Sequence, residues 1–155
     1  FSLIGIEYSL NMNMSSRSVF ENILYVVAIA VTPAFAEEFA FRGILMGSLR
    51  KYGNSFAIIV SAVMFGAMHG NIIQIPFAFI LGLIFAYIDC KANSIIPSII
   101  IHFINNFYSV IMDILQSQNI VTTRSFYKIY YSIFTAMLVF GVLAFLYIMK
   151  KDNKL

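Results

Sequence analysis

Long apolar runs, separated by short polar stretches, constrain this chain more than any other feature of its sequence. The runs cover residues 22–49, 55–69, 72–90, 94–115 and 129–149. Most of them approach the roughly 20 residues that a helix needs to cross a bilayer, and the second needs an extension or a tilt. In lipid, a segment must satisfy its own backbone hydrogen bonds, which favours helices. We therefore predict an all-α fold, a polytopic transmembrane helix bundle.

The composition supports the same class of protein. Of the 155 residues, 61% are hydrophobic and 11% are charged, whereas a soluble domain is about half apolar and about a quarter charged. Too few polar side chains are present to cover a water-soluble globule of this size. Cys90 is the single cysteine, which excludes an intramolecular disulfide and a cysteine metal cluster.

We predict a single membrane-embedded domain over residues 1–155, with its core at about 22–116. The chain begins with Phe-Ser-Leu instead of Met, and its first 21 residues are typical of the end of a preceding helix and a loop. We therefore expect a longer protein with additional N-terminal helices. Pro33 should kink the first helix without ending it, because neighbouring helices can satisfy the freed carbonyl.

The basic residues lie in short clusters between the apolar runs. This distribution offers no continuous patch for phosphates, so we expect no nucleic-acid partner. It follows the positive-inside rule, which predicts a multi-pass protein of the bacterial cell membrane with a cytoplasmic C-terminus. In that orientation six basic residues lie inside (Arg50, Lys51, Lys91, Lys150, Lys151 and Lys154) and three lie outside (Arg17, Arg124 and Lys128).

Polar side chains also lie deep within three of the apolar runs, where a charge costs roughly 2.5–3.5 kcal/mol. Depth follows from about 1.5 Å of rise per residue, counted from the inner turns. By this count Glu37 and Asn106 lie about 20 Å deep, His69 about 22 Å and His102 about 14 Å. Polar groups of three helices therefore reach one broad layer of the membrane.

Helical spacing orients the acidic residues of the first run. Glu38 and Arg42 are four residues apart, so they share a helix face and can form an ion pair. Glu37 is rotated by about 100° from Glu38, which predicts that the two carboxylates do not face the same partner. One carboxylate can then be structural while the other is free for chemistry.

The fourth run carries a polar stripe that should face a cavity, made of His102, Asn106, Ser109 and Asp113. Each polar feature has a plain explanation when it is taken alone. The Glu–Arg pair can lock the bundle, a histidine can lie at the interface, and a His–Asn pair can join helices by hydrogen bonds. Their joint occurrence at matching depth favours a functional site.

These residue types suit the cleavage of a peptide bond by water. A carboxylate in a sheltered cavity can act as a general base toward water. An imidazole can share the proton or bind a metal, and an amide with a second imidazole can stabilise an oxyanion. No Ser or Cys nucleophile lies in an evident triad, and the His-Glu-x-x-His motif of zincins is missing.

Three ordered motifs resemble those of the CPBP family (CAAX protease and bacteriocin-processing, Abi-like) of intramembrane metalloproteases. Residues 37–43 read Glu-Glu-Phe-Ala-Phe-Arg-Gly, residues 65–69 read Phe-Gly-Ala-Met-His, and residues 102–106 read His-Phe-Ile-Asn-Asn. In order, they resemble the first motif of this family, its second motif Phe-x-x-x-His and its third motif His-x-x-x-Asn. The family includes the CAAX prenyl endopeptidases. The resemblance covers about residues 25–110.

The resemblance implies a role for each motif residue. Glu37 would activate the hydrolytic water together with His69, His102 and Asn106 would stabilise the oxyanion, and a supporting ion pair would join Glu38 to Arg42. Zinc held by Glu37, His69 and His102 is one alternative, and activation of water without a metal is the other.

The expected function is that of an intramembrane endopeptidase acting on a membrane-associated peptide or protein. The composition resembles that of AT-rich bacteria, which lack a CAAX pathway, so a prenylated substrate is not carried over. One alternative is a non-catalytic membrane protein of bacteriocin self-immunity or partner binding. A proton-coupled carrier is another, although the inverted repeats that transporters often show are not evident here.

Overall fold

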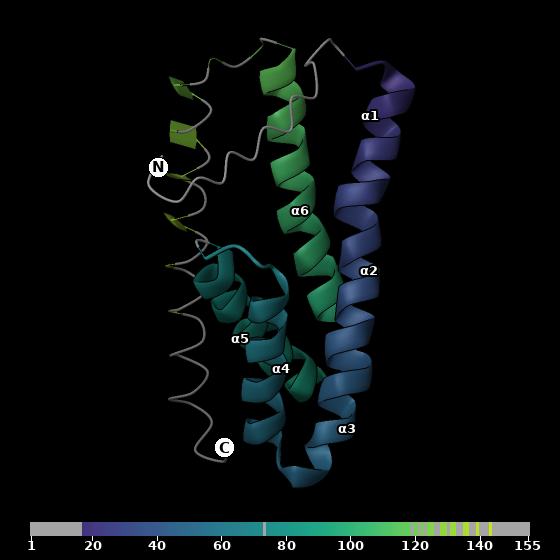
Figure 1. Ribbon diagram of the computed structural model, residues 1–155, viewed down its shortest axis with the longest axis vertical. Helices are drawn as coiled ribbons and strands as arrows, with labels where there is room; N and C mark the ends of the chain where they lie inside the picture. Colours follow the sequence, from purple (N-terminus) through teal and green to yellow (C-terminus); the bar gives the residue numbers. More distant parts are fainter. Residues whose placement is uncertain are drawn as a thin grey trace.

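Helices make up every regular element in the part of the chain that the computed structural model describes (Figure 1). That part comprises residues 17–72 and 74–118, with positions 120, 122, 124, 125, 128, 129, 131, 132, 135, 136, 139 and 143. The predicted all-α membrane bundle is confirmed. Three of its helices are long and apolar enough to cross a membrane. Residues 1–16 and most of the predicted last span, 129–149, lie outside the described residues.

The first of these helices runs without interruption over 34 residues, Val19–Tyr52. Its consecutive segments are α1 (Val19–Val26), η1 (Val27–Val31), α2 (Thr32–Glu38), η2 (Phe39–Met46), α3 (Gly47–Leu49) and η3 (Arg50–Tyr52). Ser18 starts it with a capping box that it forms with Glu21. Gly53 ends it with a φ of 116°, a conformation that side chains other than glycine rarely adopt.

Pro33 does not end this helix, as predicted. The turns just before it, η1, are widened into a π-helix, which is a common accommodation in helices that contain proline or a functional site. The hydroxyl of Thr32 donates a hydrogen bond to the carbonyl of Val27 at 2.9 Å. A second π-helical segment, η2, follows Glu38 and contains Arg42. Nothing in the apolar pattern predicts this widening.

Three further helices complete the described bundle: α4 (Asn54–Met68), α5 (Gln74–Ala92) and α6 (Ile96–Ser117). The predicted runs match them to within about two residues. At 15 residues, α4 is the shortest of the three and falls below the length of a full span. Pro97 lies in the first turn of α6, where its missing N–H removes no helical hydrogen bond.

Small residues bring the helices close together. Ala30, Ala34, Ala57, Ala62 and Ala86 are fully buried. A Cβ added at Gly82 of α5 would lie 3.2 Å from the Cα of Ala62 in α4, and one at Gly66 would lie 3.1 Å from the carbonyl of Ile75. Packing of small residues drives helix association in lipid, where no hydrophobic effect operates between helices. Large apolar side chains such as Phe35, Phe39, Ile59 and Ile104 are left exposed on the outside.

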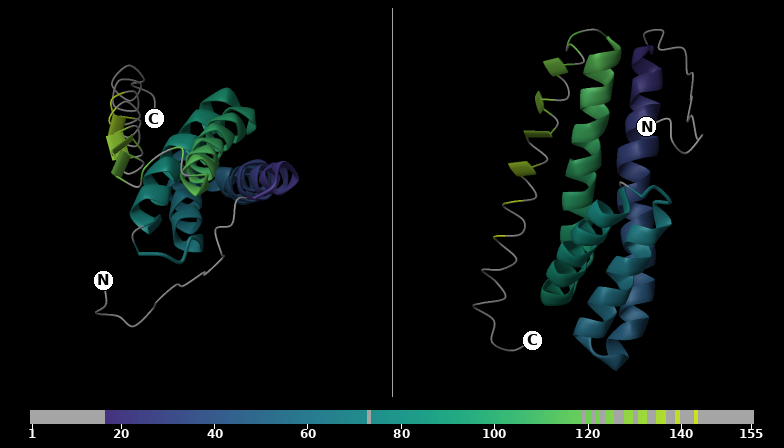
Figure 2. Two further views of the ribbon diagram at one scale, coloured as in Figure 1. Left: turned by 90° about the horizontal axis from the view of Figure 1, so that it is seen from above. Right: turned by 60° about the vertical axis from the view of Figure 1, so that its left-hand side comes forward.

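The arrangement places three helices around one region. α4 packs closely against α5 and against η2, while α6 packs against η1 and α2. In Figure 1, α4 and α5 lie beside the half of the long helix that follows Pro33, and α6 runs alongside the same helix toward α1. Figure 2 shows the same neighbours from two further directions. The polar residues of α2, α4 and α6 are thereby directed toward one another.

Candidate active site

A buried ion pair lies at the centre of the site. Glu38 and Arg42 are 0% and 2% exposed, and Arg42 Nε lies 3.1 Å from Glu38 Oε2. Arg42 Nη1 also donates to Glu38 Oε1 at 3.3 Å, and Nη2 donates to the carbonyl of Gly82 at 3.2 Å. The predicted pair between residues four apart is therefore confirmed. Its guanidinium group ties the long helix to α5.

His102 of α6 lies between the two adjacent carboxylates. Its Nδ1 is 2.8 Å from Glu38 Oε1, and its Nε2 is 4.0 Å from Glu37 Oε2. The prediction that Glu37 and Glu38 do not face the same partner is wrong. The two nitrogens of an imidazole lie on different edges of the ring, so carboxylates from neighbouring helical positions can each approach one nitrogen.

The two glutamates differ in burial. The side chain of Glu38 is fully buried, whereas that of Glu37 is 26% exposed. Glu38 contacts Arg42 and His102, while Glu37 lies within electrostatic range of His102 and His69. Glu38 therefore has the contacts of a structural anchor, and Glu37 is the more exposed of the two carboxylates.

His69 ends α4 and joins the site through an aromatic cluster. Its Nδ1 is 2.9 Å from the carbonyl oxygen of Phe65, and the Phe65 ring meets both imidazoles edge-on, with centroid distances of 5.1 Å to His69 and 5.8 Å to His102. The guanidinium of Arg42 lies 4.2 Å above the same ring. Phe65 thus holds the two histidines and the arginine in fixed relation, which explains an aromatic residue four positions before His69.

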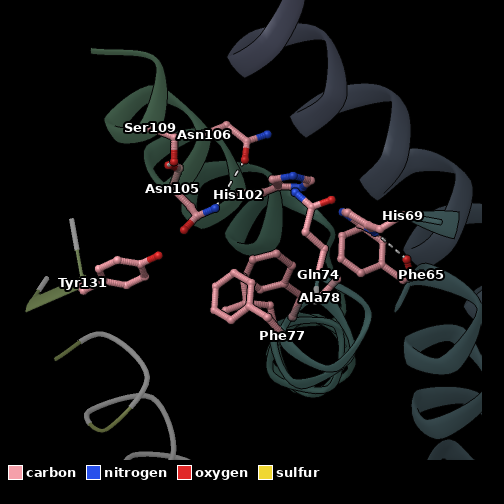
Figure 3. A pocket seen from close by; sticks show the side chains of 12 residues that line it. Phe65, His69, Gln74, Phe77, Ala78, His102, Asn105, Asn106, Ser109 and Tyr131 are labelled. Atoms are coloured by element: carbon pink, nitrogen blue, oxygen red, sulfur yellow. Dashed lines mark hydrogen bonds between the residues drawn. The ribbon is translucent and has the colours of Figure 1, made fainter. Parts of the chain in front are cut away.

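A cavity of about 420 Å³ opens beside the histidines. Figure 3 shows His69, His102, Asn105, Asn106 and Gln74 around it. Phe65, Phe77, Ala78, Leu81, Phe85, Ser109 and Tyr131 complete its lining. His102, Asn106 and Ser109 of the predicted polar stripe therefore face one cavity. Glu37 is not among the lining residues and reaches the site beside His102.

Asp113, the last member of the predicted stripe, lies elsewhere. Its Oδ2 forms an ion pair with Arg17 Nη1 at 3.1 Å, so it joins the start of the long helix to the end of α6. At eleven residues from His102, it is three turns away along the helix. The stripe is therefore divided between the cavity and this distant pair.

Several lining residues were not identified from the sequence, among them the polar residues Asn105 and Gln74. Asn105 donates from Nδ2 to Asn106 Oδ1 at 3.3 Å, so the two neighbouring amides form one polar part of the lining. The side chain of Gln74 extends from the start of α5 toward the two histidines (Figure 3). A polar residue at the start of an apolar run was the available signal for Gln74, but helix ends are commonly polar.

The possible metal donors of the site are Glu37, His69 and His102. Among residues 17–72, 74–118 and the later described positions, no group of three or more His, Cys, Asp or Glu side chains is arranged to hold a metal ion. His102 Nδ1 is already bonded to Glu38, and His69 Nδ1 to a backbone carbonyl. A histidine that ligates a metal commonly makes such a bond with its other ring nitrogen, so the zinc alternative stays a prediction.

Fold and site together define a membrane-embedded helical protein with a glutamate–histidine centre. A family model described as type II CAAX prenyl endopeptidase Rce1-like matches residues 19–108, which include all three motifs. The chain belongs to this family. The match supports a membrane protease at the level of the family.

A relative in Bacillus subtilis (strain 168), named "Putative membrane peptidase YdiL", is 27% identical over 103 residues. The aligned region is 66% of this chain and 42% of that protein, so the chain spans less than half the length of the relative. No solved structure matches the chain.

Proposed function

We propose that this protein is an intramembrane endopeptidase that hydrolyses a peptide bond with a water molecule activated by Glu37 and His69. The observation that carries the proposal is the gap of 4.0 Å between Glu37 Oε2 and His102 Nε2. This gap is too long for a hydrogen bond and suits a bridging water or a substrate oxygen. It lies beside a cavity that His69 and Asn106 also line.

The hydrogen bonds of the two imidazoles support different roles. His69 Nδ1 faces a carbonyl oxygen, which only accepts, so Nδ1 carries the proton and Nε2 of neutral His69 is an acceptor. His102 Nδ1 faces the carboxylate of Glu38 and likewise donates. The proposed role of its Nε2, which lies 4.0 Å from Glu37 Oε2, is to donate to a substrate oxygen in that gap.

In the proposed reaction Glu37 accepts a proton from water as its oxygen attacks the scissile carbonyl carbon. His69 Nε2 orients this water. The negative charge that develops on the carbonyl oxygen is stabilised by donation from His102 Nε2 and the amide of Asn106. The proton held by Glu37 passes to the leaving nitrogen, the C–N bond breaks, and a carboxylate and an amine are released.

The walls of the cavity support a membrane-associated peptide or protein as substrate. Phe77, Ala78 and Leu81 of α5 form an apolar side, and the amides of Asn105 and Asn106 on α6 form a polar side. Such a division suits an extended segment that presents apolar side chains to one wall and peptide groups to the other. We place the protein in the cell membrane with its C-terminus in the cytoplasm, on the basic-residue count.

The decisive experiment measures cleavage of candidate membrane peptides in liposomes by the wild type and by Glu37→Gln. Loss of a general base lowers kcat by about 10² to 10⁴, so we expect the variant to be slower by that factor. Glu21→Gln is the matched control, since Glu21 is an exposed residue of the same helix that caps its first turn. Equal cleavage by Glu37→Gln and the wild type would exclude Glu37 as the base.

Metal dependence requires a separate measurement. The proposed reaction uses protein groups alone. We expect activity to survive a chelator and the purified protein to contain far less than one equivalent of zinc. Loss of cleavage with the chelator, restored by zinc, would contradict this part of the proposal.

Protection against a peptide toxin that survives Glu37→Gln would indicate non-catalytic immunity instead.

A further inference from the structure

Asp89 is a buried carboxylate that the proposed reaction does not use. It lies on the last turn of α5 and is 1% exposed. Its two oxygens accept hydrogen bonds from one residue of the next helix: Oδ1 from the backbone N–H of Ser98 at 3.1 Å and Oδ2 from the Ser98 hydroxyl at 2.5 Å. Ser98 is 0% exposed. The cluster is therefore sealed from solvent and specific to this pair of helices.

The position of Ser98 makes these bonds a cap for α6. The first four N–H groups of a helix have no partner within it, and Ser98 is the third residue of α6. Ile95, the residue before the helix, supplies no side-chain cap. Asp89, which belongs to the neighbouring helix α5, supplies a cap for the Ser98 N–H instead. A cap supplied by another helix also fixes where α6 starts and how it is rotated relative to α5.

The connection between the helices is short and tightly folded. Asn93 lies in the turn with a φ of 50°, and the N–H of Ser94 donates to the carbonyl of Asp89 at 3.2 Å. Asp89 therefore closes the turn through its backbone and holds the start of α6 through its side chain. Both interactions act on the end of α6 that leads into the site.

Ser98 and His102 are four residues apart and share one face of α6. The face that Asp89 holds is thus the face that presents His102 to Glu38. Asp89 also lies within electrostatic range of Arg42 and Glu38. A rotation of α6 would move the His102 imidazole away from Glu38.

We propose that Asp89 is a positioning residue, which holds α6 in the rotation that places His102 Nδ1 on Glu38. The proposal concerns the structure of the site, and only its effect on turnover rests on the proposed function. A misplacement of about 1 Å can lower a rate by about 10². We therefore expect Asp89→Ala to lower kcat at least tenfold with KM changed less than twofold, in protein that is still folded.

The test reads the position of His102 directly. The chain contains two histidines. Protein labelled with ¹⁵N-histidine and purified in detergent without a histidine tag therefore gives two imidazole spin systems. The variant His69→Asn removes one of them and so assigns both. In the wild type we expect a hydrogen-bonded Nδ1 proton for His102. In Asp89→Ala this signal should shift by more than its linewidth or disappear through exchange.

Three further variants separate positioning from general destabilisation. Asp89→Asn keeps an oxygen for the Ser98 N–H, so it should preserve the His102 signal. Ser98→Ala should shift that signal, while Ser117→Ala, at the far end of α6 with a local bond to Ile114, should not. If Asp89→Ala does not fold, Ser98→Ala decides. An unshifted His102 signal in the deciding variant, or an equal change in Asp89→Asn, would overturn the proposal.

The spectrum is independent of catalysis. If the wild type shows no peptidase activity but Asp89→Ala shifts the His102 signal, the proposed function is wrong and Asp89 still positions the helix. If the wild type is active and the signal does not respond, the positioning role is wrong and the proposed function stands.

Discussion

Replacement of Arg42 by alanine tests whether the buried ion pair holds the site together. The guanidinium lies between the long helix and α5, where it contacts Glu38 and the Gly82 carbonyl. Its removal leaves the Glu38 carboxylate buried with His102 as its remaining partner, and loss of one partner of a buried pair costs about 3–5 kcal/mol. The Gly82 carbonyl lies inside α5, where the helix itself supplies a hydrogen-bond donor, so the loss of Arg42 adds little there.

The expected loss of about 3–5 kcal/mol is a large part of the roughly 5–15 kcal/mol that stabilise a typical protein. The assay is reversible unfolding in detergent, followed by circular dichroism. Lys51→Ala is the control, because Lys51 is an exposed cation of the same helix that lies over the ring of its neighbour Tyr52. We expect it to lose about 1 kcal/mol or less. Similar losses in the two variants would refute the assigned importance of the buried pair.

The remaining predictions concern the oxyanion donor and helix packing. Asn106→Ala should lower kcat by about 10² to 10³ with little change in KM, while Asn54→Ala, on an exposed turn, should leave both unchanged in the same liposome assay. An unaffected kcat in Asn106→Ala would remove this residue from the site. Gly66→Ala should destabilise the protein by about 1–3 kcal/mol, because its Cβ would lie 3.1 Å from the carbonyl of Ile75. In Gly47→Ala the added Cβ would lie 4.0 Å from its nearest neighbour, the carbonyl oxygen of Arg42. We expect this variant to be neutral or stabilised by up to about 1 kcal/mol. Equal unfolding free energies in Gly66→Ala and Gly47→Ala would contradict the packing described.

Much of the architecture could be predicted from the sequence because apolar run length and helical spacing are local properties. Run lengths located the helices, and the four-residue spacing of Glu38 and Arg42 predicted their ion pair, which the structure confirms. The depth estimate also anticipated that the first and fourth runs would bring a glutamate and a histidine together. His102 indeed lies against Glu38.

The rest depends on how helices rotate against one another, which spacing along one helix does not determine. An ideal helix separates Glu37 and Glu38 by about 100°, yet both lie near His102 because the partner ring has nitrogens on two edges. Asp113 shares a stripe with His102 but pairs with Arg17 at the other end of the bundle. The π-helical turns around α2 likewise had no signal in the apolar pattern.

The central claim is that Glu37 and His69 act on the same water molecule, and a double-mutant cycle tests it most directly. The kcat for cleavage of one membrane peptide would be measured for the wild type, Glu37→Gln, His69→Asn and the double variant in liposomes. Groups that act as a unit give non-additive losses, so we predict that the double variant is scarcely slower than Glu37→Gln alone. Losses that multiply in the double variant would show that the two residues act independently and would contradict this account.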